Sequence, residues 1–215
     1  MNAYYLRFAL AGLVNVAACT SAPIRYYTLI APPDKPLQAA TATLAIEVRV
    51  VHLPPQLNRS GLMVRTGPTE TTLLENEQWA SSVKDEIKEA VRLELERRLS
   101  GRTGLPASFT KLALDIDVQR LEAELGRYAL LEASWRANLS GAGQPLSGAR
   151  VTTCTFRVHE EIHSGYAGMV EGYQRGLAAL ADAIVAVLTS PAKDIDAPCQ
   201  TSIAGSAGGS GQKGR

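Results

Sequence analysis

Residues 79–99 read WASSVKDEIKEAVRLELERRL, and this stretch carries the clearest periodic pattern in the chain. Its apolar side chains recur every fourth position, with charged side chains between them: Trp79, Val83, Ile87, Val91, Leu95 and Leu99. This spacing predicts an amphipathic helix with one core-facing stripe, which Gly101 and Gly104 would end. We expect Trp79 to pack this helix into the core, and a place at a subunit contact is the alternative.

Short strands are predicted on the N-terminal side of this helix. Residues 44–53 alternate apolar and charged side chains, the period of two expected for a half-buried strand. Residues 61–65 and 69–74, separated by Gly67-Pro68, are typical of a hairpin. The sequence YYTL at residues 26–29 is a candidate edge strand between segments rich in Pro, Ala and Thr.

Three further strands and a second helix follow the first helix. The strands are expected at residues 112–118, 131–139 and 149 to about 159, because apolar side chains alternate in each. Residues 166–188 carry a second helical stripe, which ends before Pro191. The order strands, helix, strands, helix predicts an α/β (α+β) domain with a mixed sheet covered by two long amphipathic helices. Since its strands alternate, one face of that sheet should be less buried and suited to pairing with another protein.

The N-terminal sequence Val16-Ala17-Ala18-Cys19 closes a mainly apolar run and has the form of a bacterial lipobox. Residues 1–18 would be a signal peptide cleaved between Ala18 and Cys19, with Cys19 carrying lipid such as palmitate. Thr20 rather than Asp follows the cysteine, which predicts retention at the outer membrane, facing the periplasm. Plain secretion or a buried N-terminal helix is the alternative.

The remaining boundaries follow from composition. Residues 19–43 would form the lipidated N-terminus, a tether and the edge strand. Residues 44–190 would form a single domain, and residues 191–215 would form a flexible tail rich in Gly and Ser.

The full chain has 22 Lys and Arg against 21 Asp and Glu, and removal of Arg7 with the signal peptide leaves 21 against 21. A mature chain without net charge is not typical of nucleic-acid binding.

Cysteines and histidines supply the candidate site residues. With Cys19 assigned to lipid, Cys154 and Cys199 become a candidate disulfide pair, and two free thiols are the alternative. Residues 159–163 read HEEIH, the pattern in which His159 and His163 would bind zinc on a helix while Glu160 activates water.

The zinc interpretation is disfavoured by its context. The alternation of residues 153–158 predicts that the chain enters the motif as a strand, where positions four apart lie about 13 Å from each other. Ser164-Gly165 then interrupts the chain, and His52 is the only other histidine. Asp115 and Asp117 could bind a cation, but charges that alternate along a strand usually lie on its solvent-exposed face. We therefore expect no catalytic residues, no metal and no cofactor.

Several short motifs, in order, resemble the ABC-type transport auxiliary lipoprotein family, which includes the PqiC/YmbA-like lipoproteins of Pqi and MCE lipid transport systems. They are YYTL at 26–29, the strand at 46–57 ending in VHLPPQL, EQWA at 77–80, and the helix start GYAGMV at 165–170. Cys154, Cys199 and the long tail depart from the family pattern.

The resemblance implies a noncatalytic, lipid-anchored auxiliary subunit of an MCE-type lipid transport system. It would dock with periplasmic MCE-domain partners at the outer-membrane end, assemble with itself, and support envelope integrity. The partner-contact residues stay unknown. The alternatives are a periplasmic lipoprotein that itself binds lipid and a zinc hydrolase that uses HEEIH.

Overall fold

The computed structural model of the chain describes residues 22–32, 44–100, 105, 109–141, 150–190 and 199–204. Cys19, Gly101 and Gly104 lie outside these residues. Two helices and eight strands are described, with a short 3-10 helix at Pro55–Leu57. Their bounds are β1 Arg25–Tyr27, β2 Ala45–His52, β3 Gly61–Arg65, β4 Thr71–Trp79, α1 Val83–Leu99, β5 Phe109–Glu124, β6 Tyr128–Gly141, β7 Arg150–Glu161, α2 Gly165–Thr189 and β8 Cys199–Ala204.

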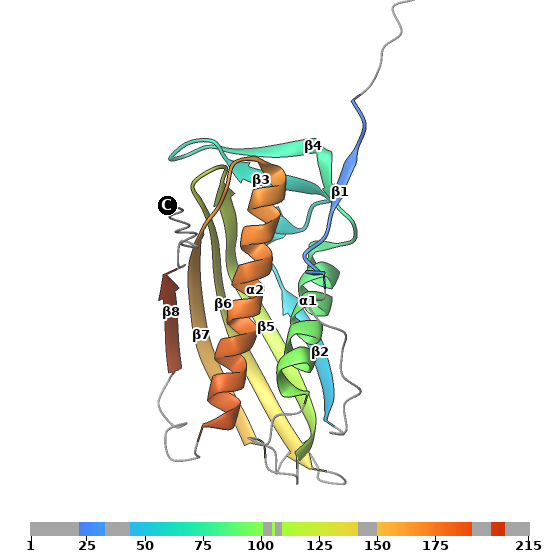
Figure 1. The fold of residues 1–215 in the computed structure, drawn as a ribbon, viewed down its shortest axis with the longest axis vertical. Coiled ribbons are helices and arrows are strands. Elements are labelled where there is room, and N and C mark those ends of the chain that lie inside the picture. Colours follow the sequence, from blue (N-terminus) through green and yellow to red (C-terminus); the bar gives the residue numbers. More distant parts are fainter. Residues whose placement is uncertain are drawn as a thin grey trace, which may run out of the picture.

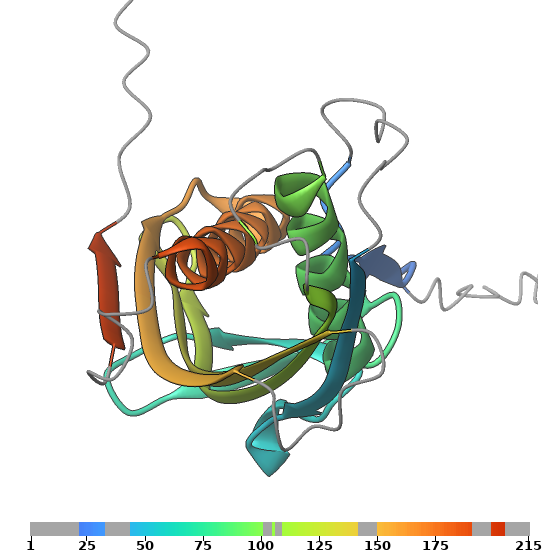
Figure 2. The same ribbon diagram turned by 90° about the horizontal axis from the view of Figure 1, so that it is seen from below.

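The strands form two sheets. The large sheet has the order β2-β5-β6-β7-β8, with β5, β6 and β7 antiparallel and the outer strands β2 and β8 parallel to their neighbours. The small sheet has the order β1-β4-β3 and lies at one end of the molecule (Figure 1). Seen from below, the large sheet curves around both helices (Figure 2). The predicted α+β class and element order are confirmed, but the single predicted sheet is two.

The core lies between the helices and the concave face of the large sheet. Alternate side chains of β5, β6 and β7 point to the helices and are almost fully buried, among them Leu114, Trp135 and Phe156. The stripe of α1 supplies Ile87, Val91 and Leu95 to the same cluster. Alternation along strands and helical periodicity therefore converge on one apolar layer.

Glycine lets α2 approach the sheet closely. A Cβ added at Gly172 would lie 2.3 Å from Ile162 Cγ2 and 3.0 Å from the Cβ of Ala129. One at Gly168 would lie 2.6 Å from the carbonyl oxygen of His163. A larger side chain at Gly172 would push the helix away from Ala129 on β6, and one at Gly168 would collide with the turn that precedes α2.

Trp79 is the last residue of β4, so its predicted place at the start of the first helix is wrong. Its backbone N–H donates to Ser60 O at 2.8 Å, and α1 begins only at Val83. Ser82 caps α1, because its hydroxyl oxygen accepts from the N–H of Asp85. The Trp79 side chain is still buried, with its ring centroid 6.4 Å from that of Tyr173.

Strands β4, β5 and β6 extend beyond their predicted bounds, and β8 is an additional strand; β4 and β8 are explained by their partners. β4 continues past residue 74 because residues 77–79 pair in parallel with β1. Residues 199–204, expected within a flexible tail, form β8 by pairing with β7. Both differences come from pairing with a segment distant in the sequence, which local composition does not reveal.

Candidate docking surface and anchor attachment

Two buried glutamates hold the segment that follows the predicted tether. Glu77 on β4 is 6% exposed, and its carboxylate accepts hydrogen bonds from Arg25 Nε at 2.9 Å and from the Tyr27 hydroxyl at 2.7 Å. Burial alone raises the pKa of Glu77, but the hydrogen bonds from Arg25 and Tyr27 and the charge of Arg25 outweigh it. The pKa of Glu77 therefore lies below its usual value, and the carboxylate stays charged.

Glu86 on α1 holds the next residues. It is 4% exposed; one carboxylate oxygen accepts from the Thr28 hydroxyl at 2.7 Å and from the Leu29 N–H at 2.8 Å. The other oxygen accepts from Ser81 at 2.8 Å. Leu29 is 1% exposed and packs in the core, while Gln174 on α2 donates to the Thr28 carbonyl. Residues 25–29, which we call the N-terminal clamp, are thus fixed to β4 and to both helices.

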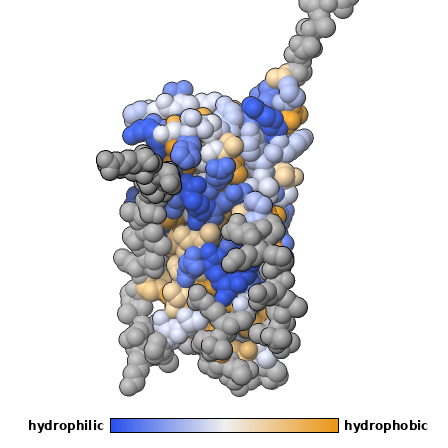
Figure 3. Space-filling view, in the orientation of Figure 1, coloured by the Kyte–Doolittle hydropathy of each residue, from blue (hydrophilic) through white to orange (hydrophobic). Residues whose placement is uncertain are grey.

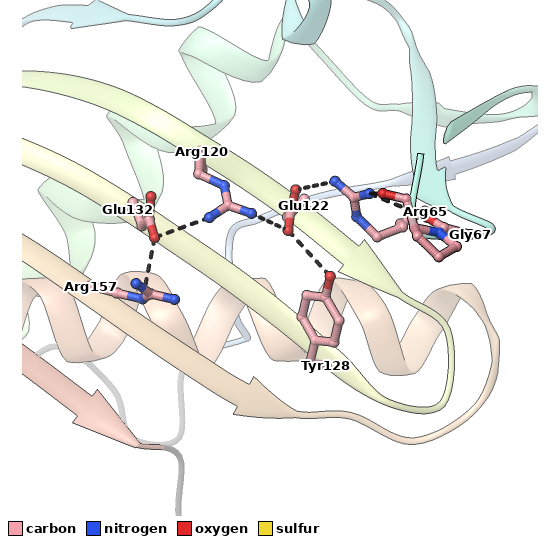
Figure 4. Close-up of polar contacts among 8 residues, drawn as sticks. Arg65, Gly67, Arg120, Glu122, Tyr128, Glu132 and Arg157 are labelled. Atoms are coloured by element: carbon pink, nitrogen blue, oxygen red, sulfur yellow. Dashed lines mark hydrogen bonds and ion pairs between the residues drawn. The ribbon is translucent and has the colours of Figure 1, made fainter. Parts of the chain in front are cut away.

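The convex face of the large sheet, which we call the outer face, carries a line of opposite charges across four strands (Figure 4). Arg65 on β3 pairs with Glu122 on β5 at 2.9 Å. The line continues from Glu122 to Arg120, then to Glu132 on β6 and to Arg157 on β7. This network joins the small sheet to the large one.

Charges on the outer face neutralise each other. Burial raises the pKa of Glu122, but Arg65 and Arg120 outweigh this and leave the pKa below its usual value. Burial and Glu122 raise the pKa of the Tyr128 hydroxyl, which donates to that carboxylate at 3.2 Å. Such a surface, with paired charges and exposed polar side chains, suits a polar protein partner better than acyl chains.

Asp115 and Asp117 lie on this outer face, as the strand pattern predicted. Asp115 accepts from Arg49 Nε at 3.1 Å, so its charge is already matched. Within the described residues, no group of three His, Cys, Asp or Glu side chains is placed to hold a metal ion.

The HEEIH segment lies at the end of a strand and not on a helix. β7 runs through Glu161, so His159 and His163 are separated by strand and turn. The exposed His159 ring stacks on Tyr128 with centroids 4.8 Å apart, and Glu160 is bound by Arg175 Nε at 3.0 Å. His52 is on β2, which β5 and β6 separate from β7. The residues present do not fit a zinc site of this class.

Cys154 and Cys199 face each other in the pairing of β7 with β8. Their Cα atoms are 4.9 Å apart and a disulfide joins the side chains. The bond attaches the C-terminal strand to the edge of the large sheet.

Two pockets beside the helices differ from the apolar, acyl-sized cavity that a bound lipid needs. A cavity beside Trp79 and Tyr173 has a volume of about 20 Å³, enough for a water molecule but not for an acyl chain. The groove between α1 and α2 is lined by charged side chains that include Glu94, Arg98 and Arg175. Figure 3 shows hydrophilic residues across the middle of this helical face.

No helix in the described ranges has the length and apolar character needed to cross a bilayer.

The sequence patterns did not indicate Glu77 or Glu86 as site residues. Charged positions on an amphipathic helix usually face water, and a buried carboxylate is recognised only when its donors are known.

A family model described as ABC-type transport auxiliary lipoprotein component matches residues 27–185. No curated protein matches the chain. One similar solved structure is an uncharacterized protein, with 19% identity and a TM-score of 0.58, covering 77% of this chain and 98% of its own. Another is a Xanthomonas campestris protein of the DUF330 family, with 17% identity and a TM-score of 0.51, covering 77% and 95%. At these identities, the two structures support the fold alone.

Proposed function

Because the chain belongs to the family of ABC-type transport auxiliary lipoprotein components, we propose that it is a noncatalytic subunit of an MCE-type lipid transport system. The observation that carries the proposal is the family match over residues 27–185, which takes in residues 27–29 of the N-terminal clamp, strands β2 to β7, α1 and most of α2. The protein would support movement of phospholipids or other hydrophobic molecules between membranes, and thereby envelope integrity.

The anchor in this proposal is Cys19, exposed as the new N-terminus after cleavage behind Ala18 and modified with lipid. It would hold the protein at the outer membrane, facing the periplasm. The Cys154–Cys199 disulfide is compatible with that oxidising compartment. The N-terminal clamp begins at Arg25 and would connect the lipid to the folded domain within a few residues.

The docking surface in this proposal is the outer face. It lies on the side of the large sheet away from the helices and presents paired charges beside exposed side chains such as the cationic Arg136. A periplasmic MCE-domain protein would bind there, and further copies of the chain would assemble around it. HEEIH lies at the end of a strand, which favours this role over zinc hydrolysis. The cavity beside Trp79 is too small for an acyl chain, which favours this role over lipid binding.

Site-specific photocrosslinking in the native cell tests the docking role. A photoreactive residue at Arg136, exposed on β6, should crosslink to an MCE-domain protein identified by mass spectrometry. The matched control replaces Lys88, which is exposed on α1, on the helical side of the large sheet. Equal capture from both positions, or none from Arg136, would contradict docking through the outer face.

The anchor is tested separately by mass spectrometry of the mature N-terminal peptide. Acylated Cys19 is expected in the membrane fraction, and Cys19→Ser should release the folded protein. A Cys19→Ser protein that stayed membrane-bound would contradict the anchor.

A further inference from the structure

We infer that the exposed surface of Ile24 and Tyr26, at the start of β1, lies in the interfacial region of the bilayer into which the lipid on Cys19 inserts. The proposed occupant of this surface, which we call the entry patch, is a phospholipid bilayer. The inference rests on the lipidation of Cys19 proposed above, and it adds which part of the folded domain touches the membrane.

The chain between Cys19 and the domain is short. Five residues, 20–24, separate Cys19 from the first residue of β1. At about 3.3–3.6 Å per residue, the fully extended chain from Cys19 to Arg25 reaches only about 20 Å. The 25 residues of α2 alone span about 37 Å. The start of β1 must therefore stay closer to the bilayer than the length of the domain.

The N-terminal clamp transmits this restraint to the whole domain. Tyr27 and Thr28 are bound to Glu77 and Glu86, and Leu29 is buried in the core. The backbone of β1 also pairs with β4, and the Ala80 N–H donates to the Tyr27 carbonyl at 2.7 Å. Since these contacts begin at the end of the tether, the small-sheet end of the molecule is held at the membrane (Figure 1).

The chemistry of the entry patch suits a membrane interface. Ile24 is 48% exposed and Tyr26 is 64% exposed, although both are large hydrophobic residues. Tyrosine is enriched at membrane interfaces because its ring is apolar and its hydroxyl is polar. Figure 3 shows hydrophobic residues beside hydrophilic ones where the N-terminal segment enters the domain.

Arg25 adds little net charge to the entry patch. Its guanidinium is paired with Glu77 and lies 5.9 Å from the centre of the Tyr166 ring. The contact with lipid is therefore apolar and should not require anionic headgroups. The opposite end of the domain, where α1 and α2 terminate, would project into the periplasm (Figure 1).

Fluorescence quenching in proteoliposomes tests the inference. The full lipidated chain carrying Tyr26→Trp is reconstituted into phosphatidylcholine vesicles that contain brominated phosphatidylcholine. The control is Val151→Trp, since Val151 is 54% exposed near the start of β7, far from the small sheet. Trp79 and Trp135 are buried, and their signal is subtracted with the parent protein.

We expect brominated lipid to lower the added Tyr26→Trp emission by about twofold and to leave Val151→Trp unchanged. High salt should not change the quenching. Absence of quenching with Cys19 shown to be acylated would overturn the entry patch and leave the proposed anchor intact. Unacylated Cys19 would overturn both.

A second copy of the chain is the competing occupant. In that case, Tyr26→Trp would be shielded from the aqueous quencher acrylamide but would not be quenched by brominated lipid, which overturns the inference. A further variant, Ile24→Ser combined with Tyr26→Trp, should lower the lipid quenching because it removes the apolar side chain of Ile24 from the contact.

Discussion

β1 and β8 are both short strands near the two ends of the described chain, and both add in parallel to the edge of a sheet. They are held by different chemistry. β1 and the residues after it depend on the buried carboxylates of Glu77 and Glu86, whereas β8 is joined to β7 by the Cys154–Cys199 disulfide. The first attachment therefore depends on the protonation state of Glu77, and the second depends on the redox state of the compartment.

The two attachments also differ in the side chains that stabilise each edge strand. A short strand contributes few backbone hydrogen bonds, so each edge needs support from side chains. At β1, that support comes from hydroxyl, guanidinium and backbone donors that converge on two carboxylates. At β8, a single covalent bond supplies it, and this bond needs an oxidant during folding.

The largest expected effect is loss of the disulfide. The variant Cys154→Ser/Cys199→Ser should be less stable by about 4 kcal/mol, because the bond closes a loop with a sequence separation of 45. Urea unfolding measures this difference. The parent protein in reductant should match the variant, and a parent unaffected by reductant would show that the bond does not support β8.

The next effect concerns Glu86. Glu86→Ala removes the acceptor of the Leu29 N–H and of two hydroxyl groups, so we expect a loss of about 3 kcal/mol and faster proteolysis before residue 30. Glu89→Ala is the matched control, since Glu89 is on the same helix but its side chain is 42% exposed. Its ion pair with Arg92 should contribute about 0.5 kcal/mol. Equal losses would mean that burial of the carboxylate is unimportant.

The pH dependence separates the two attachments. The folded state lowers the pKa of Glu77 from its ordinary value of 4.5, so its stabilising contribution is present above pH 4.5 and is lost as the pH falls through the lower folded value. The protection of the amides at residues 25–29 against hydrogen exchange, measured relative to the intrinsic exchange rate at each pH, should therefore fall below pH 4.5, while β8 stays attached. In Glu77→Gln, the acid-dependent change should disappear. Protection in the parent that does not change with pH would contradict this assignment.

The smallest effect is expected on the outer face. Arg120 is 44% exposed in its ion pairs with Glu122 and Glu132, so Arg120→Ala should lower stability by about 0.5 kcal/mol. Thermal unfolding measures the change, with Lys84→Ala on the exposed side of α1 as a control. If Arg120→Ala were as damaging as Glu86→Ala, the charges of the outer face would have a structural role equal to that of the clamp.

Local patterns in the sequence determined both helices, the alternating strands and their order. Helical and strand periods are set by backbone geometry, so the spacing of Val83, Ile87 and Val91 or of Leu112, Leu114 and Ile116 is enough to predict them. The same local rule predicted that HEEIH would begin in an extended chain. The motif order also indicated the family that the match over residues 27–185 establishes.

Only the tertiary structure decided the division into two sheets, the pairing of β1 with the end of β4, and the burial of Glu86. The Leu29 N–H and the Glu86 carboxylate are 57 positions apart, and nothing in either local segment specifies the other. A glutamate on α1 has the same local pattern whether it faces water or a buried donor. Its role depends on which distant backbone group the fold brings to it, and that choice is made by packing of the whole domain.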